Sequence, residues 1–384
     1  MFGGLAHVLA AFGTSSVDVY EWAEADVRKS RLSNKPLWSN LATPQPAIQF
    51  TGWQLAHAVI KADYLIQRDW LLPGLGFLLQ IDRIVDLGAG PNLRLMTGSP
   101  ATLNDFTRTS LAGRIGQGLS LLFAHSKGYG FVCHLASDPQ VIAHIAALPK
   151  TATKRAADFL FESQDMKRMI LESKASFTQP ENEPSPIKSK LKDALTGQVD
   201  YWMAQISPAA EKGFAVYSCL RESGSLTPSA LIFVDPPIQF VRDPISFPES
   251  LVRRRNYAAW LTLMGFPETA RSLTEPGRRD RRAIDLPVIR IGSRKFAVSV
   301  QAISQKMHQW VCAGLDVEAL ATIGAAIDGD DGPLLAYGRD ASDGFATRAS
   351  GVDYGSVFPD GSYFGVFDGI SGVHRFEGYE QFLL

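Results

Sequence analysis

The stretch AADFLFESQDMKRMILESKASF, residues 156–177, contains two apolar segments separated by a polar one. Apolar segments of this length, joined by a short polar connection, are typical of two strands in a hairpin. We place the turn at SQDMK, centred on Asp165. Asp158 lies near the start of the first segment, and Glu172 and Lys174 lie at the end of the second. Charged residues therefore occupy positions where a core hairpin normally buries apolar side chains.

The register of this hairpin predicts that its charges share one face. A turn centred on Asp165 places residue 158 opposite residue 172, and directly opposed residues of an antiparallel pair point to the same side. The Cβ atoms of Asp158 and Glu172 would then lie about 5 Å apart. Lys174 points to the same face because side chains alternate along a strand. We therefore expect two carboxylates and one ammonium group together.

The expected carboxylate pair needs a positive partner. Glu162 has one, because the same register places it opposite Arg168, whereas Asp158 and Glu172 would repel each other, and burial without a partner is costly. A divalent cation would offset the repulsion, and Mg²⁺ binds few carboxylates while it retains several waters. Lys174 would then position or activate a metal-bound water, or stabilise charge that develops on a phosphate.

The pattern D-(13 residues)-E-x-K on consecutive strands resembles the PD-(D/E)XK nuclease superfamily, which has the restriction-endonuclease-like fold. Asp158 matches the first acid, Glu172 the second acid and Lys174 the lysine, while Ala157 stands where the name of the motif has proline. The resemblance covers residues 110–240. It implies a Mg²⁺- or Mn²⁺-dependent endonuclease that hydrolyses phosphodiester bonds, with DNA as the expected nucleic acid and bacterial defence or mobile-element biology as the expected setting.

The helices on either side of the hairpin extend the resemblance in part. Some branches of the superfamily place a glutamine and a tyrosine about one helical turn apart after the lysine. Gln198 and Tyr201 are spaced i, i+3, which puts them on one helix face, so the resemblance implies that both support the site. Many members also supply a glutamate from the preceding helix. GRIGQGLSLLFAHS contains no acid and offers only Gln117, Ser120 and His125, so the number of metal ions stays open.

The order of the predicted elements indicates an α/β (α+β) protein. A chain of 384 residues predicts two or three domains. A helix, the hairpin, a second helix and further strands predict a restriction-endonuclease-like mixed sheet flanked by helices over residues 106–245. We expect a mostly helical N-terminal accessory region over residues 1–105, and an α+β C-terminal accessory region over residues 246–384. Within these regions SSVDVYEWAEADVRKSRL and KMHQWVCAGLDVEALATIGAAI are each expected to contain a helix.

The formal net charge of −1 excludes a strong overall attraction to nucleic acid, so any surface that binds phosphate must be local. Two groups of basic residues could form one, and in each case a solvated helix face is the alternative. The first is the series Lys188, Lys190 and Lys192, which begins the helix after the hairpin. The second is the arginines of 253–255 and 278–282, with Tyr257 and Trp260 nearby for stacking.

The three cysteines are far apart in sequence, which argues against a disulfide framework or a zinc cluster and suits a reducing cytosol. We find no export signal and no membrane-spanning segment, so a cytoplasmic protein without membrane contact is expected. Protein partners and homo-oligomers stay open.

Three alternatives to the nuclease hypothesis stay open. Asp158 and Lys174 could form an ordinary ion pair at the end of a sheet. The chain could instead be a non-catalytic nucleic-acid-binding or regulatory protein on the same fold. Finally, RIVDLGAGPN, residues 83–92, resembles the glycine-rich loop of an S-adenosylmethionine-dependent methyltransferase, although no strand ending in an acid follows at the expected distance.

Overall fold

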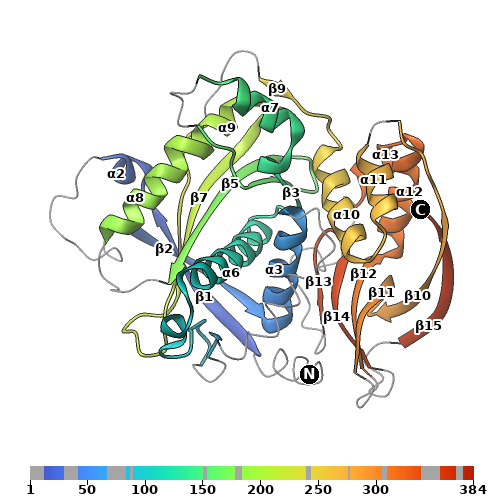
Figure 1. Cartoon of the computed structure of the whole chain (residues 1–384), viewed down its shortest axis with the longest axis horizontal. Coiled ribbons are helices and arrows are strands. Elements are labelled where there is room, and N and C mark those ends of the chain that lie inside the picture. The colour runs from blue at the N-terminus through green and yellow to red at the C-terminus, as the bar shows by residue number, and fades with distance from the viewer. Residues whose placement is uncertain are drawn as a thin grey trace.

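The computed structural model describes residues 13–29, 42–66, 84–86, 90–149, 154–177, 184–238, 244–275, 277–304, 309–338, 355–368 and 375–384. Figure 1 shows a mixed α/β architecture in which two large sheets are separated by helices. The mixed sheet flanked by helices that the sequence predicts is present. None of the described helices is long and apolar enough to cross a membrane.

The larger sheet has seven strands in the order β2-β1-β8-β7-β5-β4-β3. Its strands are β1 (Thr14–Trp22), β2 (Ala42–Thr51), β3 (Phe131–His134), β4 (Phe159–Glu162), β5 (Arg168–Phe177), β7 (Ala210–Leu220) and β8 (Ala230–Val234). The β1–β8 and β5–β7 pairs are parallel and the other four are antiparallel, so the sheet is mixed. The expected N-terminal accessory region therefore contributes two strands to the same sheet as the hairpin.

The β4–β5 hairpin has the register that the sequence predicts. Glu162 pairs with Arg168 and Phe159 pairs with Leu171, so residue 158 lies opposite residue 172. The turn is Ser163–Lys167, closed by a hydrogen bond of 2.9 Å from the Ser163 amide to the Lys167 carbonyl. The apolar residues of β4 and of β5 up to Leu171 are buried, whereas Ala175 and Phe177 are partly exposed.

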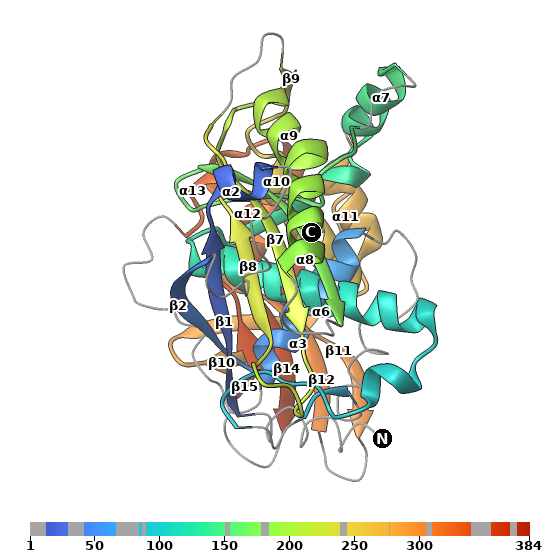
Figure 2. The ribbon, with the colours of Figure 1, turned by 90° about the vertical axis from the view of Figure 1, so that its left-hand side faces the viewer.

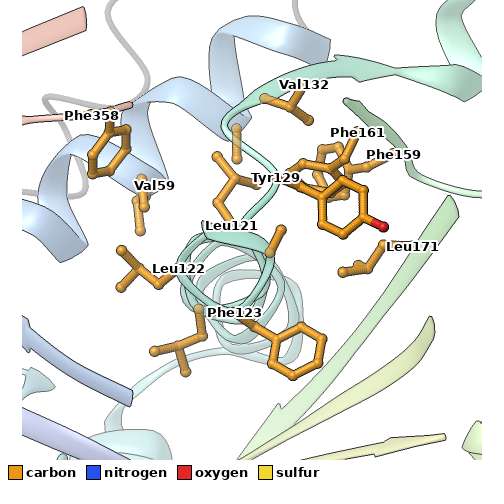
Figure 3. Packing of buried hydrophobic residues seen from close by; sticks show 14 of the residues in the cluster. Val59, Leu121, Leu122, Phe123, Tyr129, Val132, Phe159, Phe161, Leu171 and Phe358 are labelled. Carbon is orange, nitrogen blue, oxygen red and sulfur yellow. The ribbon is translucent and has the colours of Figure 1, made fainter. Parts of the chain in front are cut away.

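Helices cover both faces of the seven-stranded sheet. On one face α6 (Asp105–Ser126) packs on β5, and α3 (Gly52–Ile66) packs on α6. In Figure 3 the end of α6 is surrounded by apolar side chains, with Val59 and Phe358 on one side and Phe159 and Leu171 on the other. On the opposite face α8 (Pro184–Ala194), the π-helical turn η4 (Leu195–Val199) and α9 (Asp200–Gln205) lie against β5 and β7 (Figure 2).

The second sheet contains six antiparallel strands in the order β13-β14-β12-β11-β10-β15. The strands are β10 (Ala283–Ile291), β11 (Arg294–Ser304), β12 (Gln309–Asp316), β13 (Gly355–Val357), β14 (Ser362–Asp368) and β15 (Arg375–Leu383). The accompanying helices are α10 (Leu251–Leu263), α11 (Pro267–Thr274), α12 (Val317–Asp328) and α13 (Gly332–Ala336), which cluster beside this sheet in Figure 1. This C-terminal part is α+β in content.

The remaining elements are short. They are α2 (Glu24–Arg28), η2 (Ser99–Thr102), η3 (Leu135–Ser137), α7 (Pro139–Ala147), and the two-stranded sheet of β6 (Ile206–Ser207) and β9 (Ile245–Ser246). Asp138 caps α7, accepting hydrogen bonds from the amides of Gln140 and Val141, as the sequence predicts. All three cysteines are free and buried, in agreement with the expected absence of disulfides.

α10 protects the free edge of β3. The amide of Val132 donates a hydrogen bond of 3.2 Å to Asn256 Oδ1 on α10. Arg253, also on α10, donates to Glu162 Oε1 at 2.7 Å, and its guanidinium lies 4.2 Å from the centre of the Phe131 ring. One amide of this edge strand is thereby satisfied by the helix beside it.

Two expected helices are partly strands. In the segment expected to be helical from residue 15, Val17, Val19 and Trp22 are buried in β1, and among its described residues, 15–29, the helix is Glu24–Arg28. The alternation of apolar and polar residues in SSVDVYEW has the period of a strand, and it prevails over the helix-like serine cap. In the second segment, KMHQWVCAGLDVEALATIGAAI, the helix occupies the second half. WVCAGLD forms β12, and Asp316 then caps α12.

Candidate active site

The charges of the hairpin lie on the sheet face covered by η4 and α9. Ser173 and Ala175 point to the other face, since Ser120 of α6 donates a hydrogen bond of 2.9 Å to Ser173 Oγ. A Cβ added at Gly116 of α6 would lie 2.4 Å from that of Ala175, which shows how closely helix and strand approach. Because side chains alternate along β5, Glu172 and Lys174 point away from α6.

Asp158 and Glu172 are held together by reciprocal hydrogen bonds. Glu172 Oε2 accepts from the amide of Asp158 at 2.9 Å, and Asp158 Oδ2 accepts from the amide of Ser173 at 3.0 Å. Lys174 forms an ion pair with Glu172 Oε1. The structure therefore brings Asp158, Glu172 and Lys174 together on one face, as the register predicts. Each carboxylate keeps one oxygen free of these backbone contacts.

The environment of the pair disfavours two negative charges. Glu172 is fully buried, whereas Asp158 and Lys174 are partly exposed. Burial, followed by repulsion from Asp158, raises the pKa of Glu172 to about 7, although Lys174 opposes this shift. Burial also raises the pKa of Asp158, again against the effect of Lys174. The two acids thus lie in a place where one more positive charge would stabilise both in ionised form.

The residues present fit a divalent cation of the magnesium type. Asp158 keeps one oxygen free of backbone contacts, and Glu172 shares Oε1 with the Lys174 ammonium, so a cation bound here would replace Lys174 at that oxygen. Two carboxylates next to partly exposed surface match an ion that keeps several of its waters. The part of the chain that the structure describes contains no group of three or more histidine, cysteine or acidic side chains that could hold a metal. A site built here would therefore depend on Asp158 and Glu172 together with water.

The helix before the hairpin contributes no acid to this face. Ser120 is bonded to Ser173 on the other side of the sheet. His125 is partly buried, and its ring meets that of Phe358 edge-on at a centroid distance of 4.5 Å. The expectation that α6 lacks the upstream glutamate of the superfamily agrees with this arrangement.

Gln198 and Tyr201 have different surroundings. Gln198 on η4 donates a hydrogen bond of 2.7 Å to the carbonyl of Ala156, two residues before Asp158. The hydroxyl of Tyr201 instead bonds to Nε2 of His144 on α7. Gln198 thus holds the segment that leads into the site, whereas the hydrogen bond of Tyr201 connects α9 to α7 and does not reach the carboxylates.

One supporting residue was not anticipated from the sequence. Trp202 donates from its indole nitrogen to the carbonyl of Arg155 at 2.7 Å, beside the contact that Gln198 makes with Ala156. Gln198 and Trp202 are spaced i, i+4, which places both on one helix face. This spacing is the sequence signal from which the role of Trp202 could have been predicted. Together they fix the chain just before Asp158.

Several of the basic and aromatic residues that were expected to contact phosphates or bases are buried inside the protein. Tyr257 and Trp260 are fully buried, so the expectation that they stack on bases is wrong. Arg253 is fully buried as well, where it neutralises Glu162. Lys188 is also buried, whereas Lys190 is exposed. The lysines of α8 therefore do not form one continuous exposed edge.

The remaining motifs are structural or only partly described. IDGDDGP forms the turn between α12 and α13, in which Gly329 has a positive φ of 99° and Asp330 accepts a hydrogen bond from Gly332. In RIVDLGAGPN, Ile84–Asp86 and Gly90–Asn92 are described, and residues 83 and 87–89 lie outside the described residues. Asn92 Oδ1 accepts a hydrogen bond of 2.9 Å from Ser16 of β1.

Comparison of the chain with protein-family models, with curated proteins and with solved structures found no match.

Proposed function

We propose that the chain is a metal-dependent nuclease of the PD-(D/E)XK type, with the restriction-endonuclease-like fold as its core. The observation that carries the proposal is the cross-bonded pair of Asp158 and Glu172 with Lys174 beside it. Their order, spacing and common sheet face are those of the superfamily motif. Helices on both faces of a mixed sheet are compatible with that fold.

Each residue of the site has a distinct role in this proposal. Asp158 and Glu172 hold Mg²⁺ or Mn²⁺, which would supply Lewis acidity at a phosphodiester. Lys174, which is partly exposed, stabilises the negative charge that develops on the scissile phosphate or orients the attacking water. Gln198 positions Asp158 through the carbonyl of Ala156. Tyr201 supports α9 from outside the site.

The proposal is tested by incubating the purified protein with single- and double-stranded DNA and with RNA, in Mg²⁺ and in EDTA. We expect cleavage in Mg²⁺ that EDTA abolishes and that Lys174→Ala lowers by a factor of about 100 or more. Lys167→Ala is the matched control, because Lys167 lies in the turn of the same hairpin, is more exposed and pairs with Glu211. Lack of cleavage of every substrate, or equal rates for wild type and Lys174→Ala, would refute the catalytic role.

The second candidate is a non-catalytic nucleic-acid-binding or regulatory protein on the same fold. The observation that favours it is the ion pair of Lys174 with Glu172, which satisfies both charges without a metal. In that case neither wild type nor Lys174→Ala would cleave nucleic acid, Lys174→Ala would lower stability, and nucleic-acid binding would persist in EDTA. Binding that requires the divalent ion supports the first candidate instead.

A further inference from the structure

A cavity of about 520 Å³ lies beside the hairpin but on the other face of its sheet. It is partly open to solvent and is bordered by the end of α3, the segment from β3 to α7, and the helices α10 and α11. His134 of β3 lines the cavity and pairs with Phe159 of β4. The side chain of Phe159 points to the opposite sheet face from its neighbour Asp158, because side chains alternate along a strand. The cavity is therefore distinct from the proposed metal site.

The cavity combines an apolar surface with hydrogen-bonding groups, as binding sites for small molecules do. Its volume is within the range of such sites, about 300 to 1,000 Å³. Tyr64 and Leu65 of α3 and Ala259 of α10 supply ring and aliphatic surface, and the hydroxyl groups of Ser137 and Thr262 also line it.

Two arginines supply guanidinium groups to the cavity lining. Arg255 lines it and is held by Asp138, with 2.6 Å between Nη2 and Oδ2. The other oxygen of Asp138 accepts the first amides of α7, so Asp138 is fixed and orients Arg255. Arg271 lines the same cavity and contacts Glu268 Oε1 at 2.7 Å. A guanidinium has five N–H groups, so each arginine retains donors for a ligand.

Asp138 and Glu268, the acidic partners of these arginines, do not line the cavity. Among the described residues, Glu275 is the one carboxylate that does line it. Burial lowers the pKa of His134 to about 4, so this side chain is neutral at pH 7. The cationic groups of the lining are therefore Arg255 and Arg271, and each is already paired with a carboxylate. A guanidinium group can bond two oxygens of a phosphate or of a carboxylate at once, and a phosphate offers enough oxygens for both arginines.

We propose that this cavity binds a small phosphate ester that carries a flat apolar ring, such as a nucleoside monophosphate. The phosphate would contact Arg255 and Arg271, and the ring would lie on Tyr64, Leu65 and Ala259. The inference rests on the cavity alone and does not depend on nuclease activity.

The test is calorimetric titration of the full-length protein with adenosine monophosphate, with phenyl phosphate and with inorganic phosphate. We expect sub-millimolar binding of at least one of the two esters, and binding of inorganic phosphate at least tenfold weaker. Arg271→Gln is expected to weaken ester binding at least tenfold. Arg278→Gln is the matched control, because Arg278 contacts the other oxygen of Glu268 at 2.7 Å but does not line this cavity.

A second variant separates loss of the cavity from loss of charge. Ala259 is partly exposed at the cavity surface, so Ala259→Phe fills the space without removing an ion pair. We expect this variant to keep the melting temperature of the wild type within a few degrees and to lose ester binding. Absence of binding to both esters, or equal affinities in wild type, Arg271→Gln and Ala259→Phe, would overturn the proposal.

Discussion

At the scale of single residues, the most unusual group is Glu172. It is a fully buried carboxylate that faces a second carboxylate, and its pKa is raised to about 7 by burial and by Asp158. Its cation is the partly exposed Lys174, whereas the buried Glu162 is paired with the fully buried Arg253. The sequence predicts that Asp158, Glu172 and Lys174 share a face, because a hairpin register follows from its turn. The depth of burial of Glu172 depends on η4 and α9, which the hairpin sequence does not contain.

The raised pKa of Glu172 has a defined consequence for stability in the absence of metal. The unfolded chain ionises this group near its ordinary pKa of 4.5, whereas the folded protein holds the proton up to about pH 7. Between these values the folded state binds more protons, so this group makes stability fall as pH rises. We expect Glu172→Gln in EDTA to be more stable than wild type by about 1 to 3 kcal/mol at pH 8, and by much less at pH 4.5.

Urea denaturation of both proteins at the two pH values measures this difference. Glu211→Gln is a suitable control, since Glu211 is exposed and should change stability by less than about 0.5 kcal/mol. An equal effect of Glu172→Gln at both pH values would contradict the assigned environment of Glu172.

At the scale of elements, the contact between α6 and β5 sets the position of the site. Gly116 lets the helix approach the strand at Ala175, and Gly118 lets it approach Val59 of α3. Gly116 and Gly118 are therefore packing residues. The hairpin and α6 could be predicted because local periodicity and turn residues determine them. β1 was predicted as a helix because its serine resembles a helix cap, and this signal was given more weight than the alternation of apolar and polar residues. Its partner strand β8 is more than 200 residues away in sequence, so local sequence does not reveal the pairing.

Substitution of Gly116 by alanine tests the importance of this contact. The added Cβ would lie 2.4 Å from Ala175 Cβ, so helix and strand must separate. We expect Gly116→Ala to lower the free energy of unfolding by about 1 to 3 kcal/mol. Gly113→Ala on the same helix has nothing within 4 Å of its new Cβ and should raise stability by up to about 1 kcal/mol. Thermal or urea denaturation that gave the same change for both variants would contradict this packing.

At the scale of the whole molecule, a buried polar network joins the two sheets. Lys61 of α3 contacts Asp360 of the β13–β14 turn at 2.7 Å, and both side chains are fully buried. Asn256 of α10 and Ser362 also donate to Asp360. His57 lies between Ser356 and Ser362 and stacks on Phe358. The sequence predicts the turn at Pro359–Gly361, but its burial follows from three segments that are distant in sequence.

Removal of one partner of the Lys61–Asp360 pair is expected to be costly. Asp360→Ala leaves a buried cation without its counter-charge, which should lower stability by about 3 to 5 kcal/mol. The double variant Lys61→Met, Asp360→Ala should recover part of this loss, because no orphaned charge remains. Lys212→Ala breaks the exposed pair with Asp235 and should cost less than about 1 kcal/mol. Denaturant titrations in which the double variant is no more stable than Asp360→Ala would argue against this account of the network.

The same network is expected to be sensitive to acid. Burial lowers the pKa of His57 well below its ordinary value, and that of His125 to about 3. Below about pH 6.5 the unfolded chain binds protons that the folded protein does not, so these groups make stability fall as pH decreases. His125→Phe keeps the ring contact with Phe358 and removes one such group. It should therefore lose less stability than wild type between pH 7 and pH 5 in urea titrations, and an equal loss would contradict the buried neutral state.

The central claim, that Asp158 and Glu172 form a site for a divalent cation, is tested most directly by titration of the protein with Mn²⁺, because this measurement requires no knowledge of the nucleic acid. We expect one site with sub-millimolar affinity that strengthens from pH 6 to pH 8, as Glu172 loses its proton. Asp158→Asn and Glu172→Gln should each weaken it at least tenfold, while Lys167→Ala leaves it unchanged. No Mn²⁺ binding by wild type, or equal binding by wild type and Asp158→Asn, would contradict the account.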